Sequence, residues 1–228
     1  MNTRPVMRIA VSTVLLRNVP LFSVLPEGQL QLLTQVLSRK AYPKNSTIIA
    51  AGDPTDAMYI VVSGRLKVIM SDKEGQEVIL AILSQGEFFG EMGLIAQAPR
   101  SATVTTIEPC ELLTITRTDF TKCLQGNFDL TMNVIRGLVK RLREADRKIG
   151  SLALMDVYGR VARLLLEMAE TIDGQKVVTK KVSKRDIAKM IGASREMVSR
   201  VMKELQASGR IEVRAREILL RDSLVLTR

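Results

Sequence analysis

Histidine is absent from the 228 residues of this chain, and cysteine occurs only twice, as Cys110 and Cys123. Two thiols alone cannot provide the ligands of a structural zinc site or of a four-cysteine iron–sulfur cluster. The missing imidazole also removes the most common general base, haem ligand and zinc ligand. We therefore expect no metal site and no cofactor, and the composition argues against an enzyme. Both thiols are expected to pack as small apolar side chains.

Long hydrophobic runs are missing too. Stretches such as residues 57–62 and 78–83 are the longest, and a membrane helix needs roughly 20 apolar residues. The N-terminal segment is weakly apolar, but Arg17 interrupts it and no small-residue cleavage site follows. A signal peptide is therefore not expected, and we predict a cytoplasmic protein that makes no membrane span.

Positive charge is plentiful and unevenly distributed. The net charge is +10. Residues 157–228 hold 16 Lys and Arg against 9 Asp and Glu, whereas the longer stretch before them holds 18 against 15. This excess in the C-terminal third indicates a polyanionic partner. On charge alone, DNA, RNA and a membrane surface all remain open.

The first half of the chain has the pattern of an antiparallel β-protein. A short helix is expected at residues 27–37, with Pro26 at its start. Short β-branched runs that end in Gly, Asp or Ser then recur about every ten residues. They are STIIAAGD, AMYIVVSG, RLKVIMSD and EVILAILSQG, and SATVTTIEPCELLTIT adds two strands around a Glu-Pro turn. This spacing is typical of a sandwich or roll.

A heptad pattern follows at residues 130–155. Apolar residues alternate at spacings of three and four, flanked by charged residues. They are Ile135, Leu138, Leu142, Ala145, Ile149 and Leu152. We predict that this helix pairs with its own copy in a homodimer. An ordinary amphipathic helix on a globular core explains the stripe nearly as well.

The last third reads as a winged helix-turn-helix. A helix is expected at residues 156–172, and Asp173-Gly174 then makes a turn before a strand at 176–182. Ser183 and Asp186 form a capping box for a short helix that Gly192 ends. A second helix starts after Ser194 and closes at Gly209. Strands at 210–213 and 217–222 flank a tight turn at 214–216 and would form the wing.

The start of the second helix carries the chemistry that reads base edges. Arginine can bind guanine O6 and N7, glutamate can accept from cytosine N4, and serine can reach a base or a phosphate. The predicted DNA-binding residues are Ser183, Arg185, Ser194, Arg195, Glu196, Ser199, Arg200 and Lys203. Val198, Val201 and Leu205 are expected to anchor the opposite face. The alternative is an exposed helix stabilised by an ion pair from Glu196 to Arg200.

The segment GEFFGEMGLIAQAPRSA, residues 86–102, raises a separate question. It places one carboxylate, Glu91, nine residues before one guanidinium, Arg100, with glycines close by. A surface turn with an incidental ion pair explains it. A pocket for a small phosphorylated ligand explains it as well, because arginine binds phosphate through two charge-assisted bonds.

Nearly the whole chain resembles the cyclic-AMP receptor family, the catabolite activator proteins of the Crp/Fnr superfamily of bacterial transcription regulators. The matching stretches are GDPTDAMYIVVSGRLKV, GEFFGEMGL, RSATVTT, RKIGSLALMDVYGRVARLLL and VSKRDIAKMIGASREMVSRVMKEL. The resemblance implies an α+β protein with a β-roll sensor (1–128), a dimerisation helix (129–155) and a winged helix-turn-helix (156–228). It also implies double-stranded DNA, a second copy, a cyclic nucleotide effector and RNA polymerase as partners.

The resemblance further assigns ligand contacts. Gly90 and Glu91 would face the ribose, and Arg100 and Ser101 the cyclic phosphate. The implied site is completed by Met92, Ala145 and Asp146. Cyclic-AMP binders have a Thr-Ser pair where this chain has Ala145 and Asp146, and the turn between Gly93 and Arg100 is one residue shorter. Asp146 could accept from N1–H and N2–H₂ of guanine, so we hypothesise that it selects guanine; a solvated Asp146 explains the substitution equally well.

At the DNA end, Arg195, Glu196 and Arg200 match the base-reading positions, which implies a palindrome of TGTGA-type half-sites. Ser199 stands where cyclic-AMP members have glycine, so the outer base stays open. Asp156 marks the expected hinge. Cyclic AMP, cyclic GMP and cyclic di-GMP remain alternatives as effector. Two rival functions are a DNA-binding regulator that needs no ligand and an enzyme acting on a cyclic nucleotide; the missing histidine and the lack of a carboxylate cluster speak against the enzyme.

Overall fold

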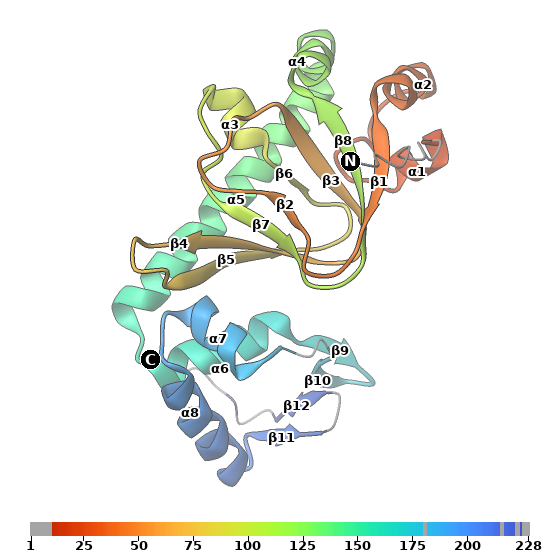
Figure 1. Ribbon diagram of the computed structural model, residues 1–228. Coiled ribbons are helices and arrows are strands. Elements are labelled where there is room, and N and C mark those ends of the chain that lie inside the picture. Colours follow the sequence, from red (N-terminus) through yellow and green to blue (C-terminus); the bar gives the residue numbers. More distant parts are fainter. Residues whose placement is uncertain (1–10, 180–181, 215–216, 222–223, 225–228) are drawn as a thin grey trace. The chain divides into compact units, whose positions relative to one another are not determined.

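The computed structural model describes residues 11–179, 182–214, 217–221 and 224 (Figure 1). The chain divides into two compact units; the first ends at Lys140 and the second begins at Arg141. In the ranges described, no helix has the length and apolar character needed to span a membrane.

The first unit contains two four-stranded antiparallel sheets, ordered β1-β8-β3-β6 and β2-β7-β4-β5. Their strands are β1 (Ser38–Tyr42), β2 (Thr47–Ile49), β3 (Ala57–Ser63), β4 (Leu66–Ser71), β5 (Glu77–Leu83), β6 (Phe88–Phe89), β7 (Thr103–Thr106) and β8 (Cys110–Thr116). The six strands predicted from the β-branched runs are therefore confirmed. The sequence reading missed β1 and β6.

Strand β3 joins the two cores of this unit. Successive side chains of a strand point to opposite faces, so Ile60 and Val61 enter different apolar clusters, and both are fully buried. Val61 meets Leu66, Val104 and residues of β8 in one cluster. Ile60 lies in the other cluster, which the helices cover.

From residue 11 onward, where the description begins, five helices belong wholly or partly to the first unit. They are α1 (Thr13–Arg17), α2 (Glu27–Val36), α3 (Glu91–Ala96), α4 (Arg117–Gly126) and α5 (Phe128–Leu154). The predicted helices at residues 27–37 and 130–155 are confirmed, each with slightly different ends. Helices α1, α3 and α4 were not predicted.

Helix α5 touches strand β6 through a glycine. A Cβ atom built on Gly137 would lie 2.7 Å from the ring of Phe88, which is closer than real carbon contacts. The ring therefore lies directly on the helix backbone. Phe88 is buried, and it precedes Gly90 by two residues.

The second unit contains a three-helix arrangement and a four-stranded antiparallel sheet of order β11-β12-β10-β9. Its elements after α5 are α6 (Val157–Met168), β9 (Glu170–Ile172), β10 (Gln175–Val178), α7 (Lys184–Ile191), α8 (Arg195–Ala207), β11 (Ile211–Val213) and β12 (Ile218–Leu220). Helix, turn, helix and hairpin follow in the predicted order (Figure 1).

One predicted element in this unit is wrong. The helix expected to continue to residue 172 ends at Met168, and Glu170–Ile172 forms β9 instead. Asp173 and Gly174 both have positive φ, 48° and 77°, as a tight hairpin turn requires. Pairing of β9 with β10 across this turn overrides the helical pattern. The strand expected at 176–182 ends at Val178; residues 180–181, the wing residues 215–216 and Asp222 lie outside the described part.

The N-caps at Ser183 and Ser194, the glycine ends and the buried anchors predicted for α7 and α8 are confirmed; at Ser183, the Asp186 carboxylate accepts from the hydroxyl group and not from the backbone N–H as in a capping box. Ser183 Oγ accepts a hydrogen bond from the Asp186 backbone N–H at 3.0 Å and donates to the Asp186 carboxylate at 2.6 Å. Ser194 accepts from the N–H of Met197 at 3.1 Å. Gly192 and Gly209 have the positive φ values of helix ends. The anchoring residues Val198, Val201 and Leu205 are buried.

Candidate ligand cassette and nucleic-acid interface

Arg100 makes most of the side-chain contacts in the segment 90–101, which we call the ligand cassette. Its side chain is only 3% exposed. Nη1 donates to the carbonyl of Gly90 at 2.9 Å, and Nη2 donates to the carbonyl of Ala57 at 2.7 Å. Nη2 also lies 3.3 Å from a carboxylate oxygen of Asp56. A guanidinium has five N–H donors in a planar fork, so the bonds to Gly90, Ala57 and Asp56 use three of them and fix its plane.

Gly90 is required for this close approach. It is the N-cap of α3 with φ 83°, a conformation that costs other residues about 1–2 kcal/mol. A Cβ atom at this position would also lie 2.5 Å from Nη1 of Arg100. Only a glycine therefore satisfies both the turn and the arginine.

A short loop before β3 carries the other side of the cassette. The backbone N–H of Arg100 donates to the carbonyl of Asp53 at 2.9 Å. Thr55 Oγ1 donates to the carbonyl of Ala98 at 2.9 Å. Arg117 binds the same loop twice, through its backbone N–H to Asp56 O at 2.8 Å and through Nη2 to Thr55 O at 2.6 Å. The loop and the cassette are therefore fixed to each other along their length.

The remaining predicted cassette residues differ in exposure. Glu91, the first residue of α3, is buried with 1% exposed, whereas Met92 is 56% exposed. Ser101 is exposed and follows Arg100 directly. Sequence and structure thus bring a buried carboxylate, a buried guanidinium and an exposed hydroxyl into one short segment.

Tyr59 reports on the electrostatics here. Its ring centre lies 5.9 Å from the Arg100 guanidinium carbon. Burial raises the pKa of Tyr59 above its ordinary value, the Asp56 carboxylate raises it further, and the Arg100 charge lowers it. The charges of Asp56 and Arg100 therefore shift the pKa of Tyr59 in opposite directions.

The predicted seam residues of α5 are mostly solvent-exposed in the single chain. Ile135, Leu142, Ile149 and Leu152 are 44%, 62%, 64% and 53% exposed. Leu138, in contrast, packs against the core of the first unit. Ala145 and Asp146 are exposed and belong to the second compact unit. Val139, 43% exposed, extends the apolar stripe and was not predicted.

Helix α8 presents a polar face opposite its buried one. The predicted DNA-binding residues Ser194, Arg195, Glu196, Arg200 and Lys203 are exposed, as are Arg185 of α7 and the α7 N-cap residue Ser183. Within the described residues, the side chains of Glu196 and Arg200 form no ion pair. The alternative of a helix stabilised by that ion pair therefore finds no support. The hydroxyl groups of Ser183 and Ser194 serve as helix caps.

Two polar contacts in this unit escaped the sequence reading. Lys184 Nζ donates to Ser199 Oγ at 3.2 Å, which joins α7 to the predicted reading face of α8. Arg160 Nη1 donates to the carbonyl of Ile191 at 2.8 Å, at the end of α7. Asp156 caps α6 through the N–H of Gly159. Only the tertiary structure reveals the Lys184–Ser199 and Arg160–Ile191 contacts, because their partners lie 15 and 31 positions apart in the sequence.

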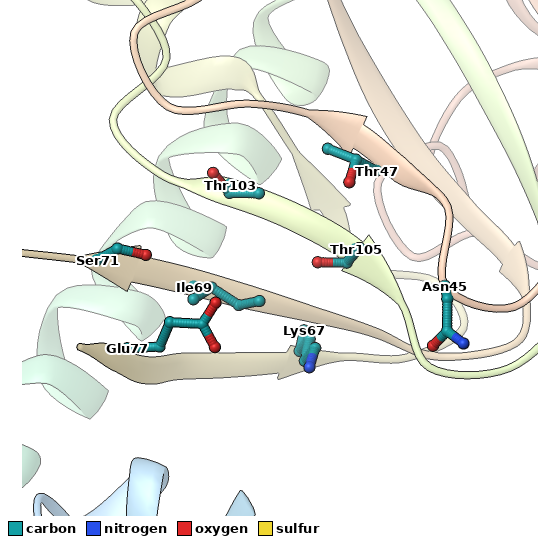
Figure 2. A pocket seen from close by; sticks show the side chains of 8 residues that line it. All are labelled: Asn45, Thr47, Lys67, Ile69, Ser71, Glu77, Thr103 and Thr105. Atoms are coloured by element: carbon teal, nitrogen blue, oxygen red, sulfur yellow. The ribbon is translucent and has the colours of Figure 1, made fainter. Parts of the chain in front are cut away.

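A hollow of about 340 Å³ lies on the sheet β2-β7-β4-β5, away from the cassette (Figure 2). Its lining is polar apart from one isoleucine and comprises Asn45, Thr47, Lys67, Ile69, Ser71, Glu77, Thr103 and Thr105. Thr103 and Thr105 alternate along β7 with Val104, which is buried in the inner core. The hollow therefore occupies the face of this sheet opposite Val104, and it contains no cassette residue.

The fold defines a class of protein: a β-roll domain that carries the segment 90–101, followed by a helix-turn-helix domain. Residues 39–127 match the family model described as the cyclic nucleotide-binding domain. Residues 159–228 match the Crp-like helix-turn-helix domain. The chain belongs to the Crp/Fnr family of transcription regulators, which are not enzymes.

Several known proteins are similar over most of their length. The cAMP-activated global transcriptional regulator CRP of Pasteurella multocida is 36% identical over 186 residues, covering 78% of this chain and 88% of that protein. The cAMP-activated regulator Vfr of Pseudomonas aeruginosa is 33% identical over 192 residues, covering 80% and 88%. Among solved structures, the c-di-GMP-responsive global regulator CLP of Xanthomonas campestris is 29% identical, with a TM-score of 0.73 and coverage of 86% and 99%.

Proposed function

We propose that this protein binds a palindromic, TGTGA-type DNA operator as a homodimer and that a cyclic nucleotide or cyclic dinucleotide controls this binding. The exposed polar face of α8 is the observation that carries the proposal. Arg195, Glu196 and Arg200 project from a helix whose opposite face is buried. These side chains have the donors and acceptors that distinguish base pairs in the major groove.

The effector part rests on Arg100 and Glu91. A buried guanidinium with spare donors suits a cyclic phosphate, and a buried carboxylate suits a ribose hydroxyl, since it only accepts hydrogen bonds. Relatives respond to cAMP in CRP and Vfr and to c-di-GMP in CLP. We propose Met92 and Ser101 as further contacts, and Asp146 as the residue that selects guanine.

The dimer part rests on α5. Its exposed apolar stripe repeats at heptad spacing, which suits pairing with a second copy. Two recognition helices related by a twofold axis would then meet half-sites one helical turn apart. We propose Asp156 as the hinge. A DNA target also leads us to propose a cytoplasmic protein, with RNA polymerase as a further partner of the operator-bound regulator.

The test is binding to a fluorescent TGTGA-type palindrome at one fixed salt concentration, without ligand and with cAMP, cGMP or c-di-GMP. We expect one nucleotide to change the affinity. Arg200→Ala should lose about 1–3 kcal/mol of DNA-binding free energy and relax the specificity at one base pair. Lys203→Ala should weaken binding to all DNA sequences alike and make the affinity depend less steeply on salt. No preference for the palindrome over a scrambled duplex would reject the operator.

One observation favours a second candidate, a regulator that needs no ligand. Gly90, Ala57 and Asp56 already engage the Arg100 guanidinium in the single chain. Under this alternative the β-roll is only structural, and all four ligand conditions give the same DNA affinity.

Asp146→Ser tests the guanine hypothesis, which an unchanged ranking of the three nucleotides would exclude.

A further inference from the structure

Asp56 stands at the edge of the ligand cassette, and its role is set by its contact with Arg100. Its side chain is 84% exposed, while that of Arg100 is 3% exposed, and the closest distance between the charged groups is 3.3 Å. One partner is thus solvated and the other is buried. Asp56 was part of the stretch GDPTDAMY in the sequence, but nothing there connects it to an arginine 44 residues later.

Asp56 is not needed to hold Arg100 in place. The guanidinium already donates to two backbone carbonyls at 2.9 and 2.7 Å, both shorter than the contact with Asp56. Backbone carbonyls within fixed elements cannot rotate away, whereas a solvated carboxylate can. The longer contact to this exposed carboxylate therefore contributes little to the orientation of Arg100.

The loop that carries Asp56 is fixed beside the guanidinium through its backbone, although the carboxylate itself can rotate. Arg117 binds the backbone of this loop at Thr55 and Asp56, and Arg100 binds it at Asp53. Asp56 therefore keeps a negative charge beside the group that would receive an anion. A like charge within a few ångströms of a bound phosphate opposes binding, by an amount that falls as salt screens it.

We infer that Asp56 is an affinity-limiting residue of the cassette: its carboxylate competes with the anionic ligand for Arg100. This inference rests on the proposed effector site, and it adds which residue weakens that site. A regulator with such a competitor responds only when its nucleotide is abundant, because the ligand has to displace the contact between Asp56 and Arg100.

The experiment measures the dissociation constants of cAMP, cGMP and c-di-GMP by calorimetry for the full-length protein and three variants. Asp56→Asn keeps the shape and removes the charge, and we expect about three- to ten-fold tighter binding of whichever nucleotide binds. Asp56→Glu keeps the charge and should resemble the wild type. Asp53→Asn removes an exposed charge three residues earlier and should change affinity by less than about two-fold.

Salt provides the readout that a structural role would not move. The advantage of Asp56→Asn should shrink between low and high salt, because screening weakens the repulsion that the wild type retains. Wild-type binding without a gain in Asp56→Asn would overturn this inference alone. Weaker binding by Asp56→Asn would overturn it too, since the carboxylate would then orient Arg100. If neither protein binds any of the three nucleotides, the effector proposal falls together with this one.

Discussion

Replacement of Gly90 by alanine gives the sharpest test of the cassette geometry. The new methyl group would meet Arg100 Nη1 at 2.5 Å, at a residue with φ 83°. The left-handed conformation costs about 1–2 kcal/mol for alanine. Displacing the guanidinium also breaks a charged hydrogen bond to the Gly90 carbonyl, about 1.5–3 kcal/mol. We therefore expect Gly90→Ala to destabilise the first unit by about 2.5–5 kcal/mol.

The chain offers a matched control at Gly75. This glycine has φ 79°, and a Cβ there would meet nothing within 4 Å. Gly75→Ala should therefore show only the backbone cost of about 1–2 kcal/mol. The difference between the two variants isolates the contact with Arg100.

Hydrogen exchange followed by mass spectrometry is the suitable assay, because it reports local opening free energies in a chain with two compact units. Peptides from β3 and β7 should exchange at least about ten-fold faster in Gly90→Ala than in Gly75→Ala, since 1.4 kcal/mol corresponds to a factor of ten. Equal exchange in the two variants would refute the packing of Arg100 against Gly90.

Three further predictions concern other parts of the chain. Arg160→Ala should lower the stability of the second unit by about 1.5–3 kcal/mol in urea unfolding, because it removes the charged bond to the end of α7; Arg163→Ala, which breaks a helix-surface ion pair, should cost no more than about 1 kcal/mol. Burial raises the pKa of Cys110 and Cys123 above its ordinary value, so less thiolate is present at pH 8; iodoacetamide should label the folded protein more slowly than free cysteine, and the labelling rate should level off at a higher pH than it does for free cysteine. Equal rates would contradict this burial. Leu205→Ala should destabilise the second unit by about 2–5 kcal/mol in thermal unfolding, because Leu205 is fully buried, and an unchanged transition would mean that α8 is anchored elsewhere.

The elements that could be predicted from sequence are those with a strong local period. Strands β3 and β5 alternate or run apolar between turn residues, and α7 and α8 begin at capping serines. Strand β1, SRKAY, is largely polar and shows no buried position, so only its pairing with β8 reveals it. Strand β6 has two residues, too few for any period.

The candidate site shows the same division. The resemblance placed Glu91 and Arg100 in one cassette, and the structure brings Arg100 onto Gly90. The sequence resemblance could not show that the Ala57 carbonyl also binds the Arg100 guanidinium, or that Asp56 lies beside that guanidinium. Those contacts join segments more than 40 residues apart, and no periodic pattern in either segment records them.

The contact between Phe88 and Gly137 bears on how a signal could leave the cassette. Most helix contacts are made through side chains, which can absorb a small displacement by rotating. Gly137 has no side chain, so the Phe88 ring rests on the peptide units of α5 themselves. A backbone shift at Gly90, two residues after Phe88, would therefore act directly on the helix α5 backbone, with no side chain of Gly137 in between to rotate and absorb it.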